Sequence, residues 1–267
     1  ILDLLLILVI PLGVLGAAIA TLIAQAVSAV LVTVTLMYRT EGMKLCLSQI
    51  RMYKRMLQSI LKIGLPAGFE AIMYSISNII VQVSINNFGV DTMAAWTAYS
   101  KIDFIFWMIN SAFGISVMTF VGQNYGAGKW DRIRRGTKIC LGMALISAVS
   151  VSIILMSAER FLFGIFVNDA GVVEIGIRMM NVIAPAYLLF AFIEVFSGAL
   201  RAQGAVVVST LITMVGICVL RMIWVTLVAA HGTLEQVIIC YPITWAAGAL
   251  AMSIYYIYKQ RKIFQAR

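Results

Sequence analysis

Two oxygen-bearing side chains near the start of the chain lie within apolar sequence. Asp3 belongs to the run ILDLLLILVI, and Thr21 lies a third of the way along the charge-free stretch 14–37. A carboxylate within a membrane span costs about 2.5–3.5 kcal/mol unless it faces a partner, an ion or water. No Lys or Arg precedes Tyr38 to pair with Asp3.

Carboxylate and hydroxyl oxygens are hard ligands that suit Na⁺ or a transported proton. We therefore take Asp3 and Thr21 as candidate cation-coupling residues. The alternative is structural: Asp3 caps the end of a short helix, and the Thr21 hydroxyl bonds back to its own helix.

Three more charged residues lie in apolar sequence further along the chain. Glu70 follows Pro66, which starts or kinks a helix, and either faces an aqueous vestibule or lies in an interfacial turn without a role. Glu194 lies about two turns before the basic end of one span, and Arg221 lies in the next span. Because each charge is costly to bury alone, we expect Glu194 and Arg221 to pair across helices. A gate made by this pair, or a proton site at Glu194, is the functional alternative.

Two further charged pairs have spacings that predict opposite outcomes. Lys101 and Asp103 are only two residues apart on one helix, so they cannot face each other. Glu174 and Arg178 are four apart, so we expect them to form a pair near the external surface.

The sequence has no motif that is typical of a membrane enzyme. It contains no Gly-rich phosphate loop, no Ser/His/Asp set and a single histidine. Its four cysteines show no paired spacing, so neither a disulfide framework nor a zinc site is indicated. We expect a protein that is not an enzyme and that binds no cofactor other than a coupling ion.

Composition requires the bilayer as solvent. The chain has 267 residues, of which 62% are hydrophobic and 12% charged, and its mean hydropathy is +1.00. Lys and Arg cluster after residues 38, 125 and 258, and Arg201 marks a fourth basic connection, whereas the connections near 90, 165 and 231 contain few. This alternation places the basic connections and the C-terminus in the cytoplasm. It explains the net charge of +9 without a nucleic-acid partner.

The apolar pattern predicts a partial span at 1–10 and a complete span at 14–37. An amphipathic helix is expected on the membrane surface over 39–62. Six spans and a basic tail are expected to follow, at 64–88, 92–124, 136–158, 171–201, 206–229, 234–258 and 259–267. Because the chain opens within an apolar run and without Met, we expect it to be part of a longer gene product.

Five segments resemble the multidrug and toxic compound extrusion (MATE) family. They are Leu2-Asp3, GVLGAAIAT at 13–21 with Gln25, GLPAG at 64–68, FVGQNYGAGK at 120–129 and SGALRAQG at 197–204. The resemblance implies an all-α polytopic bundle of twelve spans in two six-helix lobes around a cleft. The chain would then supply the end of the N-terminal lobe (1–38), a cytoplasmic linker (39–62), the C-terminal lobe (63–258) and the tail.

The resemblance also implies an antiporter of the cell membrane. It would export amphiphilic, often cationic, drugs or toxins by alternating access, coupled to Na⁺ or H⁺. The family's N-lobe cation site matches Asp3 and Thr21, and its remaining ligands fall on N-terminal spans outside this chain. Some branches use carboxylates of the C-terminal lobe, where Glu70 and Glu194 lie on the corresponding helices.

The sequence leaves two other functions open. A flippase of lipid-linked oligosaccharides with related architecture would need a large basic cavity, and deep basic residues are few. A seven-span receptor has a similar span count, but the partial first span, the 39–62 segment and the short loops argue against it. The expected partners are an amphiphilic small molecule, membrane lipid and the N-terminal spans.

Overall fold

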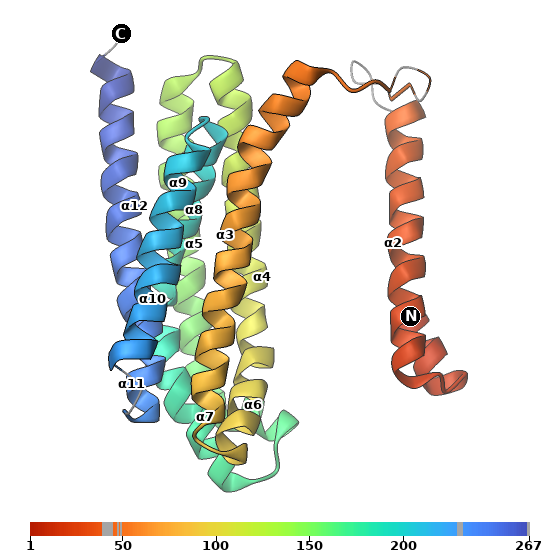
Figure 1. Cartoon of the computed structure of the whole chain (residues 1–267), viewed down its shortest axis with the longest axis vertical. Helices are drawn as coiled ribbons and strands as arrows, with labels where there is room; N and C mark the ends of the chain where they lie inside the picture. The colour runs from red at the N-terminus through yellow and green to blue at the C-terminus, as the bar shows by residue number, and fades with distance from the viewer. Residues whose placement is uncertain (39–44, 47, 49, 229–231, 266–267) are drawn as a thin grey trace. The chain divides into compact units, whose positions relative to one another are not determined.

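A computed structural model describes residues 1–38, 45, 46, 48, 50–228 and 232–265 (Figure 1). All regular structure in these ranges is helical. The chain divides into two compact units, Ile1–Gln58 and Ser59–Arg267, and each is described by itself.

The first unit contains the two predicted apolar segments, and both are helical. They comprise α1 (Leu2–Leu4) with the π-helical turn η1 (Leu5–Val9), and α2 (Gly13–Tyr38). Gly13 begins α2 at a positive φ of 54°, which glycine adopts without strain. Gly16 is buried, and only glycine fits there, because a Cβ would lie 2.7 Å from the carbonyl oxygen of Leu6. The apolar length of α2, 26 residues, is enough to cross a membrane.

The remaining helices belong to the second unit, apart from the first five residues of α3, which belong to the first unit. They are α3 (Lys54–Asn86), α4 (Val90–Gly126), α5 (Trp130–Ser157), α6 (Glu159–Phe166), α7 (Ala170–Ile183), η3 (Ala184–Ala186), α8 (Tyr187–Ala202), α9 (Val206–Thr213), η4 (Met214–Val219), α10 (Leu220–Ile223), η5 (Trp224–Val228), α11 (Leu234–Ile238) and α12 (Cys240–Gln265). The described residues hold seven helical stretches long and apolar enough to cross a membrane, and six of them run from α3 to α12. The six predicted spans are therefore confirmed as helical segments, with residue 229 of the span at 206–229 outside the described residues.

The amphipathic helix predicted over 39–62 is wrong as a separate element. Residues 45, 46 and 50–53 are not helical, and 54–62 are the first turns of α3. Helix α3 continues through Pro66, whose fixed φ fits a helix and whose missing N–H costs one backbone hydrogen bond. The rest of the predicted linker (39–44, 47 and 49) lies outside the described residues, as do residues 266–267 of the predicted tail.

Three predicted spans contain breaks in regular α-helix. Pro185 lies in the 3₁₀ turn between α7 and α8. Ile239 separates α11 from α12. The stretch from α9 to η5 contains two π-helical segments, and the four-residue α10 between them carries Arg221. A π-turn holds an extra residue, changes the direction of the side chains that follow, and often occurs at functional sites.

Helix α8 forms the centre of the second unit. Ten of its sixteen residues are buried, and it packs against α4, α5 and α12. It crosses α4 at two glycines: a Cβ on Gly198 would lie 2.8 Å from the carbonyl oxygen of Gly114 and 2.9 Å from Val117 Cγ1. Small residues at such crossings let the backbones of membrane helices approach closely.

Replacing Gly198 by Ala should destabilise the second unit. The added methyl meets backbone, which cannot move aside as a side chain does, so we expect a loss of about 1–3 kcal/mol. The thermal unfolding midpoint of the purified protein in detergent measures this loss. Gly122→Ala is the matched control, because a Cβ there has no heavy atom within 4 Å. Equal midpoints for the two variants would show that the crossing at Gly198 is not tight.

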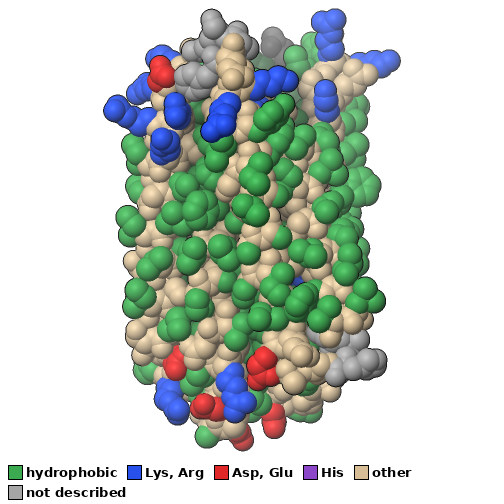
Figure 2. Space-filling model, turned by 90° about the vertical axis from the view of Figure 1, so that its left-hand side faces the viewer, with side chains coloured by type: hydrophobic (Ala, Val, Ile, Leu, Met, Phe, Trp, Pro, Cys, Tyr) green, Lys and Arg blue, Asp and Glu red, His purple; other side chains and the backbone are tan. Residues whose placement is uncertain are grey.

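The outer surface has an apolar band between two polar ends (Figure 2). Exposed large apolar side chains occur on α3, α4, α5 and α12, as expected for faces in contact with lipid. Lys and Arg gather at one end of the view in Figure 2. We call it the basic end; it comprises the α4–α5 connection, the first turns of α5 and the last turns of α12.

Candidate functional site

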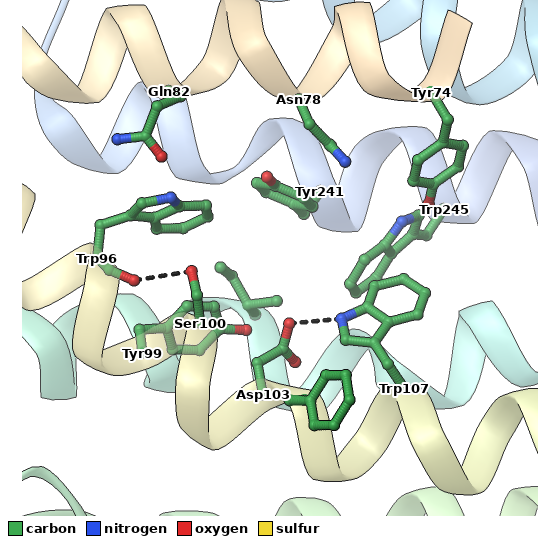
Figure 3. Close-up of a pocket in the computed structure, with 12 residues that line it drawn as sticks. Tyr74, Asn78, Gln82, Trp96, Tyr99, Ser100, Asp103, Trp107, Tyr241 and Trp245 are labelled. Atoms are coloured by element: carbon green, nitrogen blue, oxygen red, sulfur yellow. Dashed lines mark hydrogen bonds between the residues drawn. The ribbon is translucent and has the colours of Figure 1, made fainter. Parts of the chain in front are cut away.

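A cavity of about 470 Å³ lies among α3, α4, α7 and α12 of the second unit (Figure 3). Its lining residues are Tyr74, Asn78, Gln82, Trp96, Tyr99, Ser100, Asp103, Phe104, Trp107, Ile183, Tyr241 and Trp245. Seven of these twelve are aromatic and one is acidic. The volume is in the range of pockets that take drug-sized molecules. We call it the aromatic pocket.

The carboxylate of Asp103 is held in a fixed orientation at the pocket wall. Trp107 Nε1 donates a hydrogen bond of 2.6 Å to Asp103 Oδ2 (Figure 3). The Tyr187 hydroxyl donates to Oδ1. Each oxygen of an ionised carboxylate accepts about two hydrogen bonds, so both retain capacity for a ligand. The two donors come from different helices, α4 and α8, which fixes the position of the carboxylate between them.

The hydrogen bonds continue behind Asp103 to a second tyrosine. The hydroxyls of Tyr99 and Tyr187 are 3.1 Å apart and buried. Because Tyr187 gives its single proton to Asp103, it accepts from Tyr99. The ring of Phe106 stacks on Tyr187 with centroids 3.9 Å apart, which further restricts this tyrosine. The carboxylate is thus held by a hydrogen-bonded chain of two tyrosines, Tyr187 and Tyr99.

The rings around the pocket brace one another. Ring centroids are 5.4 Å apart for Trp96 and Tyr99, 5.9 Å for Trp96 and Tyr241, and 5.5 Å for Tyr241 and Trp245. The faces of such rings attract cations, most strongly where water is excluded. Aromatic walls together with one oriented carboxylate form an arrangement suited to a lipophilic organic cation.

Arg221 lies behind the pocket and does not pair with Glu194, so that prediction is wrong. Its Nη1 donates a hydrogen bond of 3.1 Å to Asn78 Oδ1, and its guanidinium lies 4.2 Å from the ring centroid of Tyr241. Arg221 is 1% exposed. The pairing fails because α10 directs Arg221 towards α3 and α12, whereas Glu194 of α8 lies against Gly114 of α4.

Glu70 forms the buried ion pair that was expected at Glu194. Its Oε1 is 2.6 Å from Arg201 Nη2, and its Oε2 accepts a hydrogen bond of 2.9 Å from Thr210. The side chain of Glu70 is 12% exposed and that of Arg201 is 30% exposed. Glu70 therefore joins α3 to α8 and α9, and both positions expected for it, an aqueous vestibule and an idle interfacial turn, are wrong.

Glu194 lies near this pair but has a different environment. Gly114 leaves the space that its carboxylate occupies, since a Cβ at residue 114 would overlap Glu194 Oε1. Arg201 and Glu70 are close enough to interact with it electrostatically. Two acids share one arginine, so the group of Glu70, Glu194 and Arg201 carries one negative charge when fully ionised. A proton or a small cation at Glu194 would neutralise it.

The predicted coupling residues of the first unit are not joined by a direct bond in the structure. The Thr21 hydroxyl donates to the carbonyl oxygen of Ala17 at 2.9 Å, and Asp3 is exposed in α1. These positions neither build nor exclude a cation site, which stays a prediction.

The predicted pairing of Glu174 with Arg178 is wrong. Glu174 lies 3.4 Å from Arg160, which reaches it from α6. Both side chains are largely exposed, so the pair contributes little to stability.

The aromatic pocket was missed from the sequence, although its pattern is readable. Trp96, Tyr99, Asp103 and Trp107 follow one another at steps of three and four, which places them on one face of α4. From the sequence we considered Asp103 only as a possible partner of Lys101, and therefore did not identify this stripe of residues. The contributions of Tyr187 and Tyr241 depend on the packing of other helices and leave no local signal.

These features define a class: a multi-pass helical membrane protein with an internal pocket. Two solved structures share the fold. One is described as the outward-facing conformation of a multidrug resistance MATE family transporter, with a TM-score of 0.89, 18% identity, and coverage of 99% of this chain and 60% of that chain. The other is described as a MOP superfamily transporter from Pyrococcus furiosus with reverse polarity of its binding pocket. It has a TM-score of 0.88 and 18% identity, with coverage of 97% of this chain and 59% of that chain.

The MatE family model matches residues 66–227, and the chain belongs to this family. A probable multidrug resistance protein, YoeA of Bacillus subtilis, is 25% identical over 260 residues, which cover 94% of this chain and 56% of the relative. The multidrug export protein MepA of Staphylococcus saprophyticus is 24% identical over 243 residues, which cover 86% of this chain and 54% of the relative. The chain thus spans about half the length of the curated relatives it matches.

Proposed function

We propose that this chain serves in the cation-coupled export of amphiphilic organic cations, and that the aromatic pocket binds the exported cation. The observation that carries the proposal is the carboxylate of Asp103, oriented by Trp107 and Tyr187 within walls of aromatic rings. Its relatives YoeA and MepA are named as a probable multidrug resistance protein and a multidrug export protein, which supports the same activity.

The lining of the pocket favours a cation over an anion. None of its twelve described lining residues is Lys or Arg, and the guanidinium of Arg221 lies behind Tyr241. Lys101 lines an adjoining hollow of about 440 Å³, but it is exposed, so water and salt screen its charge. A flippase for anionic lipid-linked sugars would need basic groups on the wall itself.

Coupling follows if the driving ion and the substrate stabilise different conformations of the two lobes. We assign the driving Na⁺ or H⁺ to Asp3 and Thr21, together with residues of N-terminal spans. The cluster at Glu194 is a second candidate for a proton, because its acids outnumber its arginine. Export then proceeds by alternating access across the cell membrane.

Asp3→Asn should uncouple export from the ion gradient in the complete gene product. The amide keeps the size of the side chain but removes the charge that holds a cation or proton. Thr21→Ala should weaken coupling less, because it removes a neutral ligand. Gradient-driven efflux in proteoliposomes measures both variants. Parental rates for Asp3→Asn across a range of pH and Na⁺ concentrations would show that Asp3 is only a helix-end cap.

The basic end should face the cytoplasm. A cysteine placed at Asn87, in the exposed α3–α4 turn, should react with a membrane-impermeant maleimide on intact cells. A cysteine at exposed Arg132 should react only after the membrane is permeabilised. Both variants are made in a background with Cys46, the exposed native cysteine, replaced by Ser. The reverse labelling pattern would contradict the orientation.

Flux in proteoliposomes tests the proposed function itself. With the complete gene product, an imposed Na⁺ or proton gradient should drive accumulation of tetraphenylphosphonium, a lipophilic cation. A receptor would show no such flux under either gradient. Flux of a lipid-linked oligosaccharide without flux of the cation would favour the flippase.

A further inference from the structure

One polar side chain of the aromatic pocket has its orientation set from behind the wall. Asn78 of α3 lines the pocket, is exposed, and lies on the opposite wall from Asp103 of α4 (Figure 3). Its Oδ1 accepts a hydrogen bond of 3.1 Å from Arg221 Nη1. A guanidinium can only donate, so the amide must direct its oxygen to Arg221. The Asn78 Nδ2 group, which carries two donor hydrogens, is thereby left for the pocket.

Arg221 is itself held in place by the pocket wall. Its side chain is 1% exposed, and its guanidinium lies 4.2 Å from the ring centroid of Tyr241 and 5.7 Å from that of Tyr74. Both rings also line the pocket. Arg221 therefore cannot turn away from Asn78 without displacing two rings of the wall.

The wall behind Asn78 carries a positive charge that no carboxylate neutralises. In the described part of the chain Arg221 forms no salt bridge, and its Nε and Nη2 atoms are buried without a hydrogen-bond partner. A buried charge is screened less than an exposed one. The wall at Asn78 is therefore the positive side of the pocket, and the wall at Asp103 is the negative side.

The other amide and hydroxyl side chains of the lining already donate within their own helices. Gln82 Nε2 donates a hydrogen bond of 2.8 Å to Asn86 Oδ1. The Ser100 hydroxyl donates one of 2.8 Å to the carbonyl oxygen of Trp96. Among the described residues Asn78 Nδ2 donates to none. Asn78 thus offers two unused donor hydrogens across the pocket from a carboxylate.

We propose that Asn78 is a specificity-determining residue of the aromatic pocket and that Arg221 is its positioning residue. The preferred ligand is an organic cation that also carries a hydrogen-bond acceptor, such as a carbonyl oxygen. Its positive end lies at Asp103, and its acceptor lies at Asn78 Nδ2. This preference rests on the proposed function, since it distinguishes among the cations that the pocket binds.

Isothermal titration calorimetry of the purified complete gene product tests the preference with three permanently charged probes. Each is a benzylic trimethylammonium ion with a second phenyl ring, and the two rings are joined by a ketone, a methylene or a secondary amine. The probes have nearly the same size, but the bridge is an acceptor, neutral or a donor. The ketone should bind about fivefold more tightly than the methylene compound, as expected for one hydrogen bond, and the amine should gain nothing.

Asn78→Asp should reverse the order of the ketone and the amine. A carboxylate keeps the bond to Arg221 but presents an acceptor to the pocket in place of a donor. Because this variant retains the buried bond, it carries the test if a change at Arg221 impairs folding.

Arg221→Gln should narrow the difference between the ketone and the amine. A glutamine amide can accept as well as donate, so Asn78 can present either end of its amide to the ligand. A purely structural role for Arg221 would instead lower all three affinities by the same factor, and that result would overturn its assignment as the positioning residue.

The matched control is Asn86→Asp, the same change further along α3. Asn86 does not line the pocket, and an aspartate there still accepts from Gln82, so the order of the probes should stay as in the parent. Equal affinities of the parent for all three probes, an unchanged order in Asn78→Asp, or the same reversal in the control would each overturn the preference and leave the proposed function standing. Absence of binding by every probe would contradict the proposed function itself, and the preference with it.

Discussion

Asp103→Asn should abolish tight binding of lipophilic cations. Removing one charge of a desolvated, hydrogen-bonded ion pair costs about 2–5 kcal/mol, so we expect the dissociation constant of tetraphenylphosphonium to rise at least about 30-fold. The amide keeps one of the two hydrogen bonds to Trp107 and Tyr187, because it has a single acceptor oxygen. Binding to the purified protein is measured by isothermal titration calorimetry.

Two controls separate a lost charge from a damaged pocket. A neutral aromatic compound of similar size should bind the parent and Asp103→Asn equally, because the aromatic walls remain. Asp91→Asn removes an exposed acid from the first turn of the same helix and should leave cation affinity unchanged. An equal loss for neutral and cationic compounds would mean that the pocket has collapsed, and unchanged cation affinity would remove Asp103 from the site.

Arg201→Gln should strongly destabilise the second unit. It strands Glu70 in a buried position beside Glu194, with no arginine to balance either carboxylate. Breaking a buried pair costs about 3–5 kcal/mol, and the lower value applies because Arg201 is 30% exposed. The thermal unfolding midpoint in detergent should fall accordingly, whereas Arg132→Gln, at an exposed position, should change it little.

A double-mutant cycle identifies the cause of that loss. Glu70→Gln/Arg201→Gln should recover part of the stability, because no uncompensated charge remains at the pair and Thr210 can still donate to the amide oxygen. Glu194→Gln/Arg201→Gln should recover less, since Glu70 stays ionised and unpaired. Additive losses in the Glu70 cycle would contradict the ion pair.

The helical architecture could be predicted because each span carries its own signal. Long apolar runs between basic connections mark spans irrespective of how these pack. The continuous α3 is an exception: Gly64 and Pro66 suggest a boundary, but the bundle supports the helix through both. The π-helical segments around α10 left no mark in the sequence, because they depend on the packing of the neighbouring helices.

The candidate site was less predictable because partner choice depends on helix rotation and on distant contacts. We predicted that Glu194 and Arg221 pair because they carry opposite charges on consecutive spans. In the structure Glu194 lies against Gly114, whereas Arg221 bonds to Asn78. Glu70 and Arg201 are separated by 131 positions, which no local pattern connects. Asp103 belongs to a readable stripe on α4, but its support by Tyr187 comes from α8.

Photolabelling with a lipophilic cation tests the location of the substrate site most directly. A tetraphenylphosphonium analogue that carries a diazirine is bound to the purified complete gene product, irradiated, and its attachment sites are mapped by mass spectrometry. We expect labels on the 96–107 segment of α4 and the 241–245 segment of α12, with loss of labelling in Asp103→Asn and under excess unlabelled cation. Competable labelling confined to residues outside the aromatic pocket would contradict the proposed substrate site.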